Sequence, residues 1–142
     1  MLTTRRGSNS KTTTTCTLVV FSIGGQRFAT RTEEVGGVWP WTSAMSVPSG
    51  TAFMNALVRR GEDVLPVFDL AAKLNVQVRG TTFLCLIAKR KDGLMAIRID
   101  DEIPTLHVVE QATIHRTTGA QAEAVDACLI GTDEVPIYSF QE

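Results

Sequence analysis

Side chains that commonly carry enzyme chemistry are scarce in this 142-residue sequence, which has two histidines, three cysteines and 6% aromatic residues. The histidines, His107 and His115, lack the spacing that places two metal ligands on one helix face. The cysteines are odd in number and form no C-x-x-C pair, which argues against a disulfide framework or a zinc site and favours a reducing compartment. We therefore expect no metal, no cofactor and three free core cysteines: Cys16, Cys85 and Cys128.

Long apolar runs and an excess of charge of one sign are absent as well. No apolar stretch approaches the ~20 residues that a membrane-spanning helix needs. The 14 Lys and Arg residues balance 15 Asp and Glu residues, for a net charge of −1. No overall field therefore draws the chain to nucleic acid or to an anionic membrane. We expect neither nucleic-acid binding nor direct membrane insertion.

The start of the chain differs in composition from the rest. Residues 1–14 are polar, and no apolar segment follows Arg5 and Arg6 as it would in a signal peptide. We expect a disordered polar tail here, with a transit peptide as the alternative interpretation. Residues 15–142 have the length of one ordinary domain.

Sequence motifs of catalysis are missing. There is no phosphate-binding P-loop, no dinucleotide-binding glycine pattern and no Gly-x-Ser-x-Gly nucleophile elbow. The acidic run Asp100–Glu102 has no second cluster of oxygen ligands, so we expect a solvated charge run rather than a cation site or catalytic carboxylates. The basic run Lys89–Lys91 lacks the interleaved aromatic residues of single-stranded nucleic-acid sites, which predicts a solvated hairpin tip. We predict that the chain is not an enzyme and has no catalytic residue.

Short strand patterns separated by turn signals fill most of the chain. Gly24-Gly25 and Asp92-Gly93 predict tight hairpin turns, because their residues tolerate the positive φ that such turns require. About nine or ten short strands with little helix predict an all-β sandwich or barrel. The clearest expected strands are 18–23, 26–30, 57–60, 64–68, 83–89, 94–99, 105–109, 125–130 and 135–140.

A few residues predict local departures from this strand pattern. Thr51 is a candidate N-cap for a short helix, and Asp69 caps a second helical turn that Asn75 closes in the left-handed region. Pro66 implies an edge strand or a bulge, because proline cannot donate to a ladder. For the same reason, the segment 39–41, with a proline between two tryptophans, predicts at least one tryptophan on a loop near the surface.

The segment Phe53–Leu70 reads FMNALVRRGEDVLPVFDL. It resembles the hallmark segment of CheW-like proteins, the coupling adaptors of bacterial chemotaxis, in which an apolar strand ends in an Asn-Leu-Arg-Gly turn. Two further segments, Leu18–Phe28 and Gly93–Asp100, are similar to the family's opening hairpin and to its later Gly-x-x-x-Val-Asp strand. The hallmark positions that match are Arg60, Gly61, Pro66, Asp69 and Leu70.

The resemblance implies an all-β domain over residues 15–142, built as two interlocked five-stranded Src-homology-3-like barrels with a shared core and short helical turns. It also implies a non-catalytic cytoplasmic adaptor, located at membrane-associated receptor arrays. Such an adaptor couples the cytoplasmic tip of methyl-accepting chemoreceptors to the regulatory domain of a CheA-type histidine kinase.

The resemblance also indicates which residues contact these partners. Arg60 is the first candidate, because an arginine at a strand–turn tip presents a planar fork of donors to a carboxylate or to backbone carbonyls. The alternative is that Arg60 pairs with Asp69 or Glu62 and only locks its own turn. Val35 and Val38 match the family's apolar positions beside that surface, although burial in a barrel explains either valine equally well.

Two alternative functions remain open at the level of sequence. The family commonly has Val-x-Glu-Ile after the opening hairpin, whereas this sequence has Val35-Gly36-Gly37-Val38. The missing glutamate favours an adaptor of a non-flagellar, pilus or gliding system as the first alternative. The second alternative is a small β-barrel that binds a ligand or nucleic acid, for which Trp39, Trp41 and Lys89–Lys91 would supply the surface.

Overall fold

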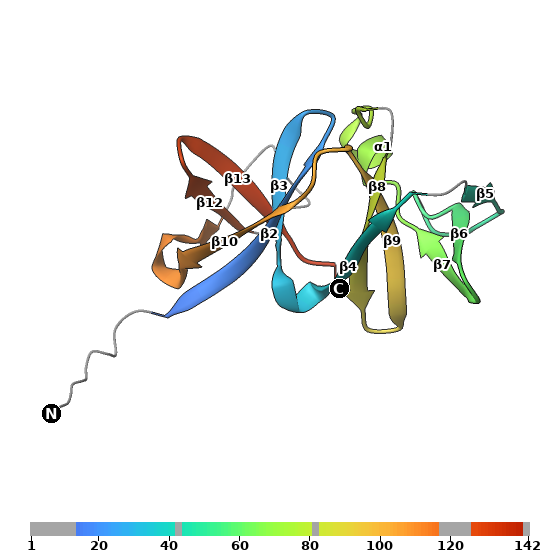
Figure 1. Cartoon of the computed structure of the whole chain (residues 1–142), viewed down its shortest axis with the longest axis horizontal. Coiled ribbons are helices and arrows are strands. Elements are labelled where there is room, and N and C mark those ends of the chain that lie inside the picture. The colour runs from blue at the N-terminus through green and yellow to red at the C-terminus, as the bar shows by residue number, and fades with distance from the viewer. Residues whose placement is uncertain (1–13, 42–43, 81–82, 117–125, 141–142) are drawn as a thin grey trace, which may run out of the picture.

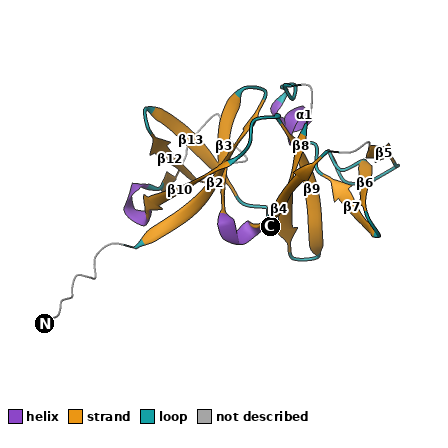
Figure 2. Cartoon of the chain, viewed as in Figure 1, coloured by secondary structure: helices purple, strands orange, loops and turns teal. Residues whose placement is uncertain are grey.

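A computed structural model describes residues 14–41, 44–80, 83–116 and 126–140 of the chain, and the prediction for the tail 1–14 falls almost entirely outside these ranges. Within them the molecule consists of two six-stranded sheets that lie side by side (Figure 1). Strands account for most of this part of the chain, and the helical segments are short (Figure 2). The predicted all-β class is confirmed.

The first sheet is assembled from both ends of the chain. Its strand order is β10-β2-β3-β13-β12-β11, so the parallel pairing of β3 with β13 joins the opening hairpin to the closing one. Its strands are β2 (Thr15–Ile23), β3 (Gln26–Arg31), β10 (Thr105–Glu110), β11 (His115–Arg116), β12 (Asp126–Ile130) and β13 (Asp133–Tyr138).

The second sheet comes from the middle of the chain, in the order β4-β8-β9-β7-β6-β5. Its strands are β4 (Val35–Pro40), β5 (Ala44–Ser46), β6 (Ala56–Arg60), β7 (Asp63–Val67), β8 (Leu84–Arg90) and β9 (Gly93–Ile99). The helical elements are η2 (Thr32–Glu34), α1 (Leu70–Leu74) and η3 (Gln111–Thr113). Each expected five-stranded barrel therefore carries one additional short strand, the two-residue β11 or the three-residue β5.

The buried residues form three clusters, and the largest contains residues of both sheets, as the shared core implied by the resemblance would. One lies inside the first barrel and one inside the second, and the largest lies between them. Strand β2 contributes to two of these clusters: Leu18 and Val20 point into the first barrel, whereas Val19 and Phe21 belong to the cluster between the barrels. Because successive residues of a strand face opposite sides, both faces of β2 are buried, which explains its continuous apolar sequence.

Most of the local predictions are confirmed. Asp69 caps α1 by accepting the Ala72 N–H (3.1 Å), and Asn75 closes the helix in the left-handed region. The segment after Thr51 forms a turn instead of the expected helix, with Phe53 at a φ of 61°. A residue with positive φ is incompatible with a right-handed helix, so the capping signal at Thr51 is outweighed by the turn.

The tryptophan–proline segment is more regular than expected. Strand β4 runs through Trp39 and ends at Pro40, at the edge of the second sheet, where a missing N–H costs no ladder bond. Trp39 and Trp41 are both half-buried and pack against the cluster inside the second barrel. Trp41 lies on a loop after the end of β4, as predicted for at least one tryptophan, but neither ring is fully exposed.

Asp100 holds the two halves of the fold together. Its Oδ1 accepts the N–H groups of Gly24 (2.9 Å) and Arg79 (2.7 Å), and its Oδ2 accepts the N–H of Gly25 (2.9 Å). The hairpin β2–β3 and the loop after α1 are thereby tied to the end of β9. The expected solvated charge run is confirmed for residues 101–102, which are exposed, and is wrong for Asp100, which is 4% exposed.

We predict that Asp100→Asn lowers the free energy of unfolding by about 2–3 kcal/mol. Both carboxylate oxygens of Asp100 accept hydrogen bonds, whereas an asparagine amide has only one acceptor oxygen and no charge to strengthen the bonds that remain. Urea denaturation followed by circular dichroism measures this loss. The matched control is Asp63→Asn, an exposed residue at the start of β7. Equal stability of the two variants would contradict the bracing role of Asp100.

Candidate partner-binding surface

Val35 and Val38, the two apolar candidates, both lie on β4, the edge strand of the second sheet. Val35 is half-buried and packs against the cluster between the barrels, whereas Val38 is 37% exposed. The register of β4 against β8 shifts between Val35 and Gly37, which turns the strand at this point. Val35 is thus partly a core residue, and Val38 is available to a partner.

The start of β4 is fixed to the first barrel through Glu34. The buried carboxylate of Glu34 accepts the N–H of Phe140 (2.7 Å) and the hydroxyl of Ser139 (3.2 Å) through the same oxygen. Phe140 and Ser139 directly follow β13, so this contact links the exit of the first sheet to the entry of the second. The chain therefore has a structural glutamate immediately before Val35, one that the motif comparison did not register.

Strand β10 contributes an apolar surface that the sequence analysis missed. Leu106 and Val108 alternate with half-buried residues and are 68% and 66% exposed. Both lie at the edge of the first sheet, where a strand normally carries charges that discourage pairing. The sequence predicted a strand at 105–109, but its place at the edge of the sheet, which leaves Leu106 and Val108 exposed, is visible only in the strand order.

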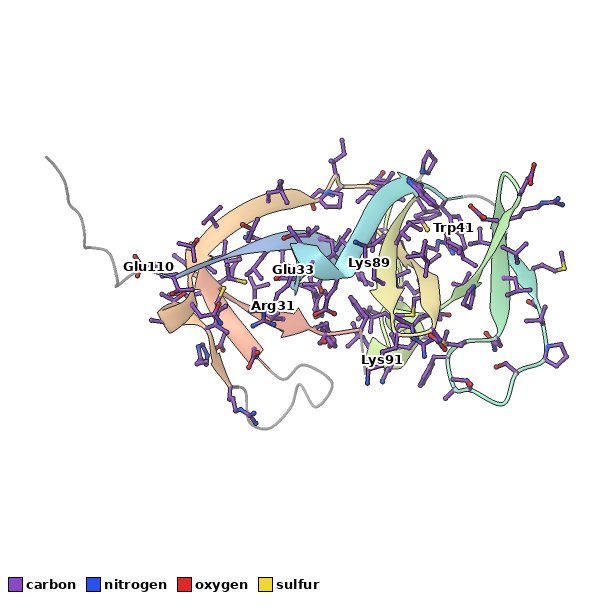
Figure 3. The ribbon with its side chains drawn as sticks, turned by 90° about the horizontal axis from the view of Figure 1, so that it is seen from below. Arg31, Glu33, Trp41, Lys89, Lys91 and Glu110 are labelled. Atoms are coloured by element: carbon purple, nitrogen blue, oxygen red, sulfur yellow. The ribbon has the colours of Figure 1, made fainter. Side chains whose placement is uncertain are left out.

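A series of contacts joins this β10 surface to the start of β4. Val108 lies opposite Thr17 on β2, and the hydroxyl of Thr32 donates to the Thr17 carbonyl (3.4 Å). Thr32 opens η2, which leads directly into Val35 and contacts both β2 and β8. Figure 3 shows Glu33 of η2 between β2 and the end of β8 that carries Lys89. We call the residues Val35, Val38, Leu106 and Val108 the junction surface.

Arg60 lies at the tip of the β6–β7 hairpin, as predicted. Its backbone ends β6 and is paired with Asp63, whereas its side chain falls outside the described part of the structure. The neighbouring Arg59 donates from Nε to the carbonyl of Gly61 (3.2 Å) and so braces the turn. The contact role of Arg60 stays a prediction.

The β6–β7 hairpin and the C-terminal end of β4 line a common pocket of about 250 Å³. Trp39 and Pro40 line it from one side, and Arg59 and Gly61 line it from the other. Val35 begins the same strand and lies at its opposite end, against the first barrel. Val35 and Val38 therefore share β4, whereas Arg60 ends β6, and the β6–β7 hairpin lies at the end of β4 opposite to Val35.

The described residues offer little reactive chemistry. They contain no group of three His, Cys, Asp or Glu side chains that could hold a metal ion. All three cysteines are buried and free, as predicted. Burial raises the pKa of the Cys85 thiol to about 11, the opposite of the shift that activates a nucleophilic thiol. Over the same described ranges, no helix is long and apolar enough to cross a membrane.

The model of the CheW-like domain matches residues 17–137, and the chain belongs to this family. Members of the family are non-catalytic scaffold proteins, which supports the prediction that the chain is not an enzyme.

Two relatives show how similar the chain is to known proteins of this kind. A probable chemotaxis protein CheW from Rhizobium etli is 27% identical over 101 residues, which cover 68% of this chain and 65% of that protein, just under two thirds of its length. The crystal structure of the scaffolding protein TtCheW from Thermoanaerobacter tengcongensis superposes with a TM-score of 0.76 at 15% identity, over 90% of this chain and 91% of that one. At this identity the second comparison establishes the fold.

We predict that the three thiols do not react with an aromatic disulfide reagent at neutral pH until denaturant is added. Cys85 is protonated under these conditions because its pKa is about 11, and all three side chains are shielded from solvent. Absorbance of the released thiolate counts the reacting cysteines before and after unfolding in guanidinium. Fast reaction of one thiol in the native protein would contradict the assignment of purely structural cysteines.

Proposed function

We propose that this protein is a non-catalytic adaptor of a bacterial chemosensory array, which couples methyl-accepting chemoreceptors to a CheA-type histidine kinase. Membership of the CheW-like family and the names of both relatives support a role in chemotaxis scaffolding. The observation that carries the proposal is the junction surface, an exposed apolar surface on a braced all-β body. The adaptor would work in the cytoplasm, at membrane-associated receptor arrays.

The junction surface has dimensions suited to one face of a helix. Leu106 and Val108 are two residues apart on β10, which separates them by about 6.6 Å along an extended strand. One helical turn rises about 5.4 Å, so apolar side chains at i, i+3 and i+4 of a receptor helix can pack between and beside these two residues. The exposed Val38 on β4 extends the contact toward the second barrel.

The kinase would bind elsewhere on the same rigid body. The β6–β7 hairpin carries Arg60 at its tip, and a guanidinium there can donate to a carboxylate or to backbone carbonyls of a kinase regulatory domain. Signal transfer then needs no chemistry in the adaptor. The receptor state biases the kinase state if the adaptor makes different contacts with each state.

The array that this adaptor serves belongs to one of two classes, a flagellar chemotaxis system or a pilus or gliding system. The segment 35–38 lacks the glutamate that is common in the family, which supports the alternative of an adaptor for a pilus or gliding array. Receptor fragments from both kinds of system therefore belong in the binding test.

We predict that Leu106→Asp and Val108→Asp each weaken binding to a receptor signalling-tip fragment by at least about tenfold, because a carboxylate in an apolar contact must be desolvated. Both side chains are largely exposed, so these changes should leave folding intact. Isothermal titration calorimetry measures the affinity, and binding to the kinase regulatory domain reports the second partner separately.

The control for these variants is Leu129→Asp on β12. Leu129 is 61% exposed, belongs to the same sheet and is separated from β10 by three strands. Equal weakening by Leu129→Asp would locate the receptor site elsewhere. Absence of binding of the wild-type protein to both partners at tens of micromolar would overturn the proposed function.

We predict that Arg60→Glu reduces kinase coupling or receptor binding without changing the melting temperature, since it reverses a charge at a hairpin tip. Reconstituted receptor–kinase complexes assayed for autophosphorylation measure coupling, and Arg59→Glu is the neighbouring control because Arg59 is engaged with Gly61. A lowered melting temperature with normal coupling in Arg60→Glu would support the alternative in which Arg60 only locks its turn.

A further inference from the structure

Arg98 occupies an inward-facing position at one end of the second barrel. Its partner across the ladder is Cys85 on β8, and Ala96 precedes it by two residues on β9. Cys85 and Ala96 both belong to the cluster inside this barrel. Cross-strand partners and alternate residues of a strand share a face of the sheet, so Arg98 lies on the inner face as well.

Two aromatic rings hold the guanidinium in place. The Cζ atom of Arg98 lies 3.8 Å from the ring centroid of Phe83 and 5.4 Å from that of Trp41. The N–H of Trp41 donates to the Phe83 carbonyl (3.0 Å), which keeps these residues side by side, just after the end of β4 and just before the start of β8. Figure 3 shows Trp41 at this end of the second barrel. The rings orient the planar group by cation–π contact without neutralising its charge.

No carboxylate of the described residues forms an ion pair with this guanidinium, and the Nε of Arg98 is buried without a hydrogen-bond partner. A partly buried charge is normally balanced by an opposite charge and by acceptors for its N–H groups. Stacking alone leaves both requirements unmet.

A pocket of about 530 Å³ opens beside Arg98. The polar residues Ser46, Asn55 and Gln77 are among those that line it, and most of the other lining residues are alanine and valine. This volume falls within the range of small-molecule sites, which often occupy the mouths of β-barrels and combine apolar walls with a few polar groups. The pocket is distinct from the junction surface and from the pocket beside Arg59.

The charges in the pocket select the chemical class of ligand. Arg98 and Asp69 both line it, so one positive charge is offset by one carboxylate. Asp69, whose carboxylate caps α1, repels any anion, but it repels a phosphate dianion more strongly than a monocarboxylate, and Arg98 neutralises only half of the dianion's charge. A single carboxylate matches the guanidinium in charge and can accept two parallel N–H bonds from it.

We propose that this barrel-mouth pocket binds a carboxylate group, with Arg98 as the anchoring residue and amide groups of Asn55 and Gln77 beside it. A free organic acid and the terminal carboxylate of a peptide present the same chemistry. The pocket does not include the residues of the junction surface or the tip of the β6–β7 hairpin.

Nuclear magnetic resonance titration of the full chain tests this proposal. Sodium acetate, sodium succinate and the peptide Gly-Gly-Ala are added separately, with sodium chloride at the same ionic strength as reference and sodium phosphate as the dianion. We expect saturable shifts of the Trp41 indole and of the Asn55 and Gln77 side-chain amides with at least one carboxylate. Acetate or succinate alone would identify the free acid as the source, and the peptide alone would identify a chain terminus.

Variants separate recognition from simple stacking. Arg98→Met should weaken carboxylate binding roughly tenfold to a hundredfold, since hydrogen bonds to a charged group are lost. Arg98→Lys keeps the charge but loses the planar pair of N–H donors, so it should also weaken carboxylate binding. This variant replaces Arg98→Met in the titration if Arg98→Met does not fold. The matched control is Arg116→Met, an exposed arginine on β11 that should bind as the wild type does. Shifts that do not saturate, that sodium chloride reproduces, or that survive in both Arg98 variants would overturn the proposal, as would tighter binding of phosphate.

Discussion

Burial of β2 on both faces is the constraint on which the rest of the structure depends. One face of the strand completes the interior of the first barrel, and the other supplies the centre of the cluster between the barrels. Each large apolar side chain contributes roughly 1.5–3 kcal/mol when it is withdrawn from water, so no other position for β2 recovers the same free energy. The Asp100 carboxylate reinforces this arrangement from the end of β9, because it fixes the turn that reverses β2 into β3.

This constraint determines where a partner can bind. The cluster between the barrels reaches the surface through the half-buried Val35, and η2 carries the chain from β3, inside the first sheet, to β4 at the edge of the second. Leu106 and Val108 of β10 lie on the same face of the first sheet as Val19. Val19 is buried between the barrels, whereas the second barrel does not cover the two β10 side chains, which stay exposed. An apolar surface therefore persists beside the junction even though the cores themselves are closed.

The sequence predicted elements whose signals are local. The glycine turn at 24–25, the capping of α1 by Asp69 and the hairpin at 92–93 follow from backbone preferences, and all are present. Predictions that depended on tertiary neighbours were less successful. Asp100 is buried because the N–H groups that it accepts come from segments about 20 and 75 residues away in sequence, which no local pattern reveals. The sequence did not predict strand β4, which carries Val35 and Val38, and only the pairing of β10 with β2 showed where Leu106 and Val108 lie.

The parallel pairing of β3 with β13 has a consequence for biosynthesis. The partner of β3 is made more than 100 residues later, so the first barrel cannot close until the last hairpin has left the ribosome. The middle segment, from β4 to β9, has all of its strand partners within reach much earlier. We therefore expect a chain that stops short of β13 to contain every strand of the second sheet but to leave β3 unpaired along the edge that β13 covers. Such a chain is a substrate for chaperones and proteases.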